Sequence, residues 1–171
     1  MLMLVGAAWI AVSAPAPGEL EQAGAAPAVG FQAPDFTLGT LDGGQVRLSD
    51  LQGQAVLLNL WASWCGPCRA EMPAMQRVYE EYRDDGFVVL AVNATNQDRI
   101  SAAAAFVDEL GLTYPIGLDL DGAVSRLYGL QALPSSFFID RDGVIREVII
   151  GGPMAEALLR IRAEQLLEGA E

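Results

Sequence analysis

The sequence predicts an α/β fold, in which a mixed β-sheet is flanked by helices on both faces and preceded by a β-hairpin extension. Two apolar runs, 55–60, broken only by Asn59, and 87–92, are separated by a helical pattern. This order is typical of buried parallel strands joined by a helix. Two later runs, 135–139 and 144–150, are joined by the turn sequence 140–143, which predicts an antiparallel pair.

The N-terminal hairpin and the first helix follow from local patterns. Two short alternating segments, 33–38 and 45–48, flank Asp42-Gly43-Gly44, and Asp-Gly at this spacing is a hairpin signal. A helical pattern runs from Pro67 to about Arg83, with apolar residues three and four positions apart. Pro73 lies inside this pattern, where a proline is expected to kink the helix.

The second half of the chain alternates further helices with strands. Asp98 is expected to cap a helix over 99–110, and a shorter helix is expected over 121–128. Between these helices, 116–118 predicts a short strand. A closing helix is expected over 154–167, and its buried face is expected to carry Met154, Ala157, Leu158 and Ile161.

Composition limits the partners that this chain can take. It has 22 acidic residues against 10 basic ones, a net charge of −12. Nucleic acids and anionic lipid surfaces attract basic patches, so neither is an expected partner. About 140 residues remain after the N-terminal segment, which is the usual size of one domain with a single core.

The lack of histidine narrows the possible chemistry. With 0 His and 2 Cys, the chain has no imidazole base, no Ser-His-Asp triad and too few ligands for a structural zinc site. No cofactor or metal is therefore expected. The available reactive groups are thiols and carboxylates.

The N-terminal segment is expected to lie outside the domain. Residues 1–14 carry no charged side chain and match the apolar region of a signal peptide or membrane anchor. A Pro/Gly/Ala-rich linker is expected over 15–29, followed by the domain over 30–168. This organisation predicts an extracytoplasmic protein, in the periplasm or on the outer face of the cytoplasmic membrane. Whether it is tethered or released stays open.

The two cysteines form a Cys-x-x-Cys motif, Cys65-Gly66-Pro67-Cys68, between a buried strand and a helical pattern. Two thiols at this spacing can close and reopen a disulfide. The first sulfur stands at a helix N-terminus, where unpaired N–H groups and the helix dipole favour the thiolate. The motif therefore predicts a dithiol–disulfide oxidoreductase.

Motifs along residues 30–167 resemble the thioredoxin superfamily, and within it the ResA/TlpA-like extracytoplasmic oxidoreductases, which have an AhpC/TSA-Redoxin-type domain and a thioredoxin-like fold. Several motifs stand in the order found in that family. They are Ala-Pro-Asp-Phe-Thr-Leu at 33–38, Leu-Asn-Leu-Trp-Ala-Ser-Trp-Cys-Gly-Pro-Cys at 58–68, Glu-Met-Pro at 71–73, and Leu-Pro-Ser-Ser-Phe-Phe-Ile-Asp at 133–140.

The resemblance implies roles for individual residues. Cys65 would be the attacking thiol and Cys68 the resolving thiol. Pro134 matches the family's cis-proline, which lies beside the disulfide and offers backbone to the substrate. Leu133 and Trp64 would complete the substrate-binding surface.

Glu71 is the expected proton acceptor of the site. Thioredoxin has a buried acid six residues before its first cysteine, but here Asn59 occupies that position and cannot relay a proton. Glu71 lies one helical turn beyond Cys68 and matches the ResA-type active-site glutamate. A carboxylate near the thiols raises their pKa, and a partly desolvated one can accept a proton from the resolving thiol.

The family resemblance implies a reductant of extracytoplasmic protein disulfides. Its leading substrate would be apocytochrome c during cytochrome c maturation, and a membrane thiol reductant of the CcdA/DsbD type would recharge it. A monomer is expected. The Gly66-Pro67 pair resembles that of reductants, although an oxidising role stays open.

Two other functions occur on related folds. Peroxiredoxins share the Ala-Pro-Asp-Phe motif, but they have Thr or Ser three residues before the reactive cysteine, where this chain has Ala62. Copper chaperones of the Sco type use Cys-x₃-Cys with a distal histidine, and this chain has neither. Both alternatives are less consistent with the sequence than disulfide exchange.

Overall fold

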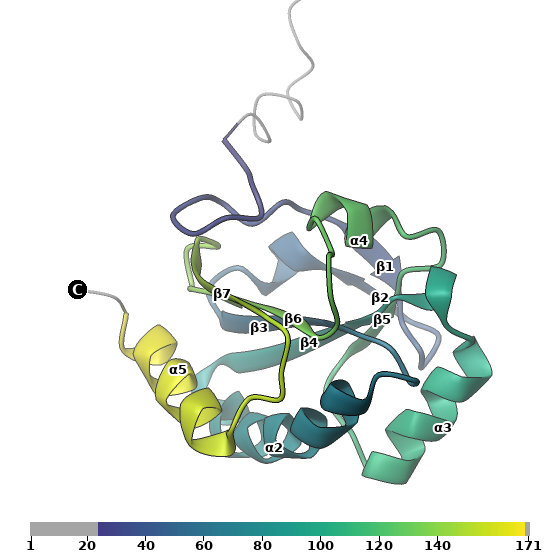
Figure 1. Cartoon of the computed structure of the whole chain (residues 1–171). Coiled ribbons are helices and arrows are strands. Elements are labelled where there is room, and N and C mark those ends of the chain that lie inside the picture. The colour runs from purple at the N-terminus through teal and green to yellow at the C-terminus, as the bar shows by residue number, and fades with distance from the viewer. Residues whose placement is uncertain (1–23, 170–171) are drawn as a thin grey trace, which may run out of the picture.

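A computed structural model describes residues 24–169 and contains two sheets (Figure 1). The expected segment 1–14 and most of the expected linker 15–29 lie outside these residues. A two-stranded hairpin precedes a five-stranded sheet of order β5-β4-β3-β6-β7. The strands are β1 (Thr37–Gly39), β2 (Gln45–Arg47), β3 (Ala55–Trp61), β4 (Phe87–Asn93), β5 (Ile116–Leu118), β6 (Ser135–Ile139) and β7 (Ile145–Ile150).

Strand β3 is the centre of the main sheet. It pairs in parallel with β4 and antiparallel with β6, so that Leu58 lies opposite Leu90 on one side and Phe137 on the other. All seven residues of β3 are buried. This position explains why the run is apolar except for Asn59, because a central strand covered on both faces has no solvent-facing side. The mixed sheet with flanking helices confirms the predicted fold class.

Two hydrophobic clusters lie on opposite faces of the sheet. Leu57 and Trp61 of β3 point into one cluster, whereas Leu58 and Leu60 point into the other, as the two-residue period of a strand requires. The first cluster is covered by α2 (Gly66–Tyr82), α3 (Ile100–Leu110) and α5 (Glu156–Glu168). The second is covered by α4 (Ala123–Leu127) and the N-terminal segments (Figure 1).

The β1–β2 hairpin protects one edge of the main sheet. The N–H of Leu41 donates to the carbonyl of Ile116 in β5, at 2.9 Å, and Thr40 bridges Gly117. A Cβ at Gly117 would lie 3.1 Å from the Leu38 side chain, so glycine permits this close packing. The hairpin thereby occupies hydrogen-bonding groups that an edge strand would otherwise expose.

The boundaries of the expected domain and helices differ in places from the structure. Within residues 24–169, no helix is long and apolar enough to cross a membrane. The N–H of Ala26 donates to Gln32, and that of Gly30 donates to Ile145, so residues before 30 already contact the fold. The domain boundary at 30 stays a prediction.

Helix α2 continues through Pro73 from Gly66 to Tyr82.

Asp98 does not cap α3, contrary to the sequence prediction. The residue at the N-cap position is Arg99, and its side chain makes no capping hydrogen bond. The Asp98 carboxylate binds the active-site loop instead, as described below. A helix-cap rule considers only local sequence, whereas Asp98 accepts hydrogen bonds from Ser63, which lies 35 positions away in the chain.

The buried face of α5 also differs from the predicted one. Its buried residues are Leu159, Ala163 and Leu166, whereas Ile161 is 48% exposed. Apolar residues occur on two sides of this helix, so periodicity alone does not indicate which side is buried. The choice is made by packing against α2, supported by ion pairs from Arg77 and Arg160 that link the two helices.

The buried face of α5 predicts unequal costs in stability for two substitutions on this helix. Leu159→Ala should lower the free energy of unfolding by about 2–5 kcal/mol, because it leaves a cavity beneath α2. Ile161→Ala should change it by less than about 0.5 kcal/mol, because the side chain is largely in solvent. Urea unfolding of the two variants and the wild type measures both values. Equal losses would contradict the assignment of the buried face.

Candidate active site

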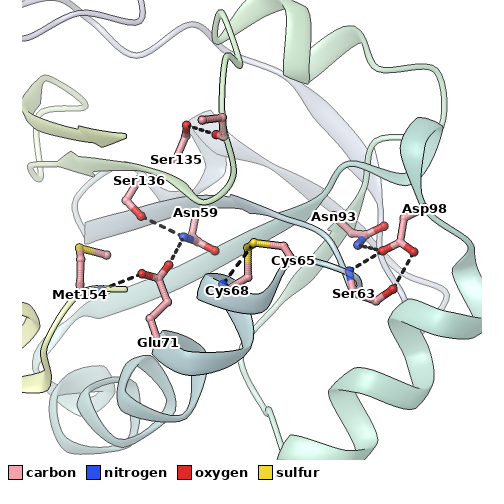
Figure 2. Close-up of a disulfide and its surroundings, with 11 residues drawn as sticks. Asn59, Ser63, Cys65, Cys68, Glu71, Asn93, Asp98, Ser135, Ser136 and Met154 are labelled. Atoms are coloured by element: carbon pink, nitrogen blue, oxygen red, sulfur yellow. Dashed lines mark hydrogen bonds between the residues drawn. A yellow bond between two sulfur atoms is a disulfide. The ribbon is translucent and has the colours of Figure 1, made fainter. Parts of the chain in front are cut away.

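The two cysteines form a disulfide at the junction between β3 and α2 (Figure 2). Cys65 is the N-cap residue of α2, and Pro67 occupies the first turn, where its missing N–H costs no hydrogen bond. The Cys65 sulfur accepts from the N–H of Cys68 at 3.2 Å. Because the N–H of Cys68 points at it and it lies at the positive end of the helix dipole, this sulfur is in a position that stabilises a thiolate.

The two sulfurs differ in accessibility. Cys65 is 5% exposed and Cys68 is 0% exposed. An incoming disulfide can therefore approach Cys65 more readily than Cys68. This asymmetry fits one attacking and one resolving thiol.

Glu71 is fully buried, three residues after Cys68 on α2. Residues at this spacing share a helix face. The Glu71 carboxylate accepts from Asn59 Nδ2 at 3.1 Å and from the N–H of Met154 at 3.0 Å. Burial raises the pKa of Glu71 above its ordinary value, and these two hydrogen bonds only partly oppose that effect. A carboxyl with a raised pKa can hold a proton nearer to neutral pH.

Asn59 connects Glu71 to the centre of the sheet. Its Nδ2 also donates to Ser136 Oγ at 2.9 Å, across the β3–β6 pairing (Figure 2). Asn59 Oδ1 has no hydrogen-bond partner within residues 24–169. The sequence marked Asn59 only as a replacement for an acid. Its hydrogen bond to Glu71 shows that it holds the carboxylate in place.

The loop before β6 is fixed beside this cluster. The Leu133–Pro134 bond is cis, Pro134 is buried, and Leu133 is half-buried. The Pro134 carbonyl accepts from the N–H of Gly151 at 2.7 Å, which ties the loop to the end of β7. The Gly151–Met154 segment was missed in the sequence, although its Gly-Pro pair after a strand marks an irregular backbone.

The two tryptophans beside the motif have different environments. Trp61 is fully buried and packs on Phe106 of α3, with ring centroids 4.8 Å apart. Trp64 is 61% exposed, and its Nε1 donates to the Gln97 carbonyl at 3.0 Å. Trp64 therefore presents an apolar ring to solvent with its edge anchored.

Asp98 anchors the loop that precedes the cysteines. Its carboxylate accepts from the N–H and the hydroxyl of Ser63, both at 2.7 Å, and from Asn93 Nδ2 at 2.9 Å. Burial alone would raise the pKa of Asp98, but hydrogen bonds from Asn93, Ser63 and the Arg99 N–H outweigh it and lower the pKa. The anion therefore holds Ser63 two residues before the disulfide.

The Arg69 side chain contacts two residues of α3. It pairs with Glu109 at 2.7 Å, and its guanidinium lies 4.6 Å from the centre of the Phe106 ring. Both contacts draw its charge toward the neighbouring helix. Within residues 24–169, no group of three or more His, Cys, Asp or Glu side chains could hold a metal ion.

Comparison with known proteins agrees with this geometry. The model of the AhpC/TSA family matches residues 29–148. The chain belongs to the AhpC/TSA family. A ResA thiol-disulfide oxidoreductase of Bacillus thuringiensis (strain Al Hakam) is 39% identical over 130 residues, which are 76% of this chain and 74% of that protein. This likeness identifies the ResA/TlpA-like branch.

Solved structures show the same fold. A candidate thiol:disulfide interchange protein DsbE of Chlorobium tepidum has a TM-score of 0.74 and 36% identity, covering 80% of this chain and 95% of that one. A secreted disulfide oxidoreductase of Mycobacterium tuberculosis, homologous to DsbE of E. coli, has a TM-score of 0.68 and 25% identity, covering 75% and 94%. The fold is thioredoxin-like, and the ResA-like chain is a thiol-disulfide oxidoreductase.

The raised pKa of Glu71 predicts a specific pH dependence of stability. The folded protein binds this proton more tightly than the unfolded chain, where the pKa is near 4.5. The folded state therefore loses stability as the pH rises from that value through the folded-state pKa. In Glu71→Gln this loss is absent, so the free energy of unfolding of the variant minus that of the wild type should increase over this range.

Urea titrations of the disulfide form between about pH 4 and pH 8 measure this difference. Ile161→Ala, which changes an exposed side chain on α5 and removes no titratable group, is the control and should give a difference that does not vary with pH. A difference for Glu71→Gln that does not vary with pH would show that burial does not raise the pKa of Glu71.

Proposed function

We propose that this ResA-like protein reduces disulfides of extracytoplasmic proteins, with Cys65 as the attacking thiol and Cys68 as the resolving thiol. The observation that supports this assignment is the unequal burial of the two sulfurs, with Cys65 at a helix N-terminus and 5% exposed and Cys68 fully enclosed. A substrate sulfur can meet Cys65 first. Cys68 is close enough to react afterwards, since the two already form a disulfide.

In the first step the Cys65 thiolate attacks one sulfur of a substrate disulfide. A mixed disulfide forms between Cys65 and that sulfur, and the other substrate sulfur leaves as a thiolate that takes a proton from water. The attack rate depends on the thiolate fraction and on nucleophilicity together. The N–H of Cys68, which points at the Cys65 sulfur, favours the thiolate.

In the second step Cys68 resolves the mixed disulfide. Its thiol gives a proton to the Glu71 carboxylate, and the resulting thiolate attacks the Cys65 sulfur. The Cys65–Cys68 disulfide forms, and the substrate sulfur leaves as a thiolate. Two electrons have passed from the enzyme dithiol to the substrate. Glu71 suits the acceptor role because it shares a buried helix face with Cys68 and has a raised pKa.

Trp64, Leu133 and Pro134 are proposed to bind the substrate chain. Trp64 offers an exposed ring with an anchored edge, which gives apolar contact area at little cost in side-chain entropy. Leu133 is half-buried and precedes the cis peptide bond. Trp64 directly precedes Cys65 in the chain, and Leu133 packs against the hydrophobic cluster that contains both cysteines.

The proposed substrate is apocytochrome c before haem attachment, and the proposed source of electrons is a membrane thiol reductant of the CcdA/DsbD type. The ResA and DsbE likenesses support a role of this class, and the secreted M. tuberculosis relative supports an extracytoplasmic location. The protein is proposed to act as a monomer. Loss of this protein is then expected to impair cytochrome c maturation.

Trapping the mixed disulfide tests the order of the two thiols. In reduced Cys68→Ser the resolving thiol is missing, so a disulfide-containing protein substrate should stay covalently attached through Cys65. Non-reducing gel electrophoresis followed by mass spectrometry identifies the linkage. The matched variant Cys65→Ser has only the enclosed thiol and should trap much less. Equal trapping by both variants, or preferential trapping by Cys65→Ser, would contradict the proposed roles.

A further inference from the structure

The Glu71 carboxylate is covered by a single layer of backbone. Glu71 itself is 0% exposed, yet Gly152 and Pro153, which lie over it, are both exposed. A Cβ built on Gly152 would lie 2.7 Å from Glu71 Oε2 and 2.9 Å from Pro134 Cγ. Real Cβ atoms essentially never approach other atoms so closely. The backbone at Gly152 therefore rests directly on the carboxylate and on the proline ring.

The same segment also donates a hydrogen bond to the carboxylate. The Met154 N–H is 3.0 Å from Glu71 Oε2, and the Gly151 N–H is 2.7 Å from the Pro134 carbonyl (Figure 2 shows the Met154 contact). Residues 151–154 thus form a strap from β7 toward α5, fixed at Pro134 and at Glu71. This strap lies between the carboxylate and the solvent that reaches Gly152.

The proposed reaction requires a proton to pass this strap. When Cys68 resolves the mixed disulfide, its proton goes to Glu71. In the resulting disulfide form neither cysteine can take the proton back, so Glu71 must release it to water before the next cycle. A carboxyl sealed from solvent can do so only if its cover opens.

We propose that Gly152 is a positioning residue that acts through Glu71: its missing side chain lets the 151–154 strap close on the carboxylate, and outward movement of the strap is the route of proton exchange. The proposal rests on the proposed function of Glu71 for its catalytic meaning. Its structural part stands on the contacts of Gly152 and the hydrogen bond of Met154.

No other group that contacts Glu71 within residues 24–169 is expected to change its charge while Glu71 titrates. Strands β3 and β6 contribute the neutral side chains of Asn59 and Ser136, and the strap contributes backbone. The titratable neighbours are Cys68, which is held in the disulfide, and Tyr114. Burial raises the pKa of Tyr114 well above its ordinary value, and the charge of Glu71 adds to this, so Tyr114 stays neutral across the range of interest.

Gly152→Ala tests the proposal in the disulfide form of the full chain. The added methyl collides with both Glu71 and Pro134, and outward movement of the strap relieves both collisions at once. Water then reaches the carboxylate and replaces the Met154 hydrogen bond. Because burial is the largest cause of the raised pKa, the midpoint of Glu71 titration should shift to lower pH.

The titration is read from the carboxyl carbon resonance of Glu71 in ¹³C-glutamate-labelled protein, assigned by its loss in Glu71→Gln. Gly39→Ala is the matched control, because a Cβ there meets nothing within 4 Å, and its midpoint should equal that of the wild type. A folded Gly152→Ala protein with an unchanged midpoint would overturn the proposal.

Hydrogen exchange of the wild type tests the strap without a variant. The Met154 amide should exchange through local opening, faster than the slowest amides of β3, which report global unfolding. Exchange of the Met154 amide only with global unfolding would overturn the proposal, even where Gly152→Ala fails to fold.

A kinetic double-mutant comparison separates this proposal from the proposed role of Glu71. Glu71→Gln should remove a Glu71-dependent limb from the pH profile of the resolution step, and Gly152→Ala should shift that limb to lower pH only when Glu71 is present. An unchanged profile in Glu71→Gln would refute the catalytic role of Glu71. A changed profile in Glu71→Gln with no shift in Gly152→Ala would refute the role of Gly152.

Discussion

The hydrogen bonding of the buried Glu71 carboxylate is the constraint on which the rest of this site depends. Taking a carboxyl out of water is costly unless its oxygens find donors. Here one donor is Asn59 in the central strand and the other is the backbone of Met154, beyond the last strand. The carboxyl on α2 therefore requires β3 and the strap after β7 to meet at one point, beside the disulfide.

The scaffold around this point gives the two sulfurs different environments. Burial of β3 on both faces fixes where α2 begins, and this places Cys65 at the N-terminus of α2 and Cys68 within the core. Asp98 fixes the loop before the motif from the other side, through Ser63. Cys65 thus keeps a small exposed area at the helix terminus, while Cys68 and the Glu71 carboxyl are fully enclosed.

Much of this could be predicted from the sequence. The strands over 55–60 and 135–139, and the long helix after the cysteines, are strongly patterned, and the Cys-x-x-Cys motif indicates redox chemistry by itself. These features depend on local periodicity or on residue types with few alternative uses. Glu71 could be singled out because the position of the usual buried acid is occupied by Asn59.

The remaining features depend on contacts between distant segments. The hydrogen bond from Asn59 to Ser136 joins residues 77 positions apart, and that from Met154 to Glu71 joins residues 83 apart. No periodicity reports such pairs. The sequence around Asp98 satisfies the local rule for a helix cap, although the carboxylate binds Ser63 instead. The sequence also leaves the buried face of α5 ambiguous, because Leu159 and Ile161 are both apolar. Tertiary packing decided each case.

The reduction potential of the Cys65–Cys68 pair tests whether this dithiol donates electrons to substrate disulfides. It is measured on the full chain by equilibration with glutathione and dithiothreitol buffers and read from the fluorescence of Trp61 and Trp64. We expect a value near the roughly −270 mV of thioredoxin, at which the reduced form is a good donor. A value near the roughly −120 mV of DsbA would contradict this expectation, because such a pair oxidises its partners.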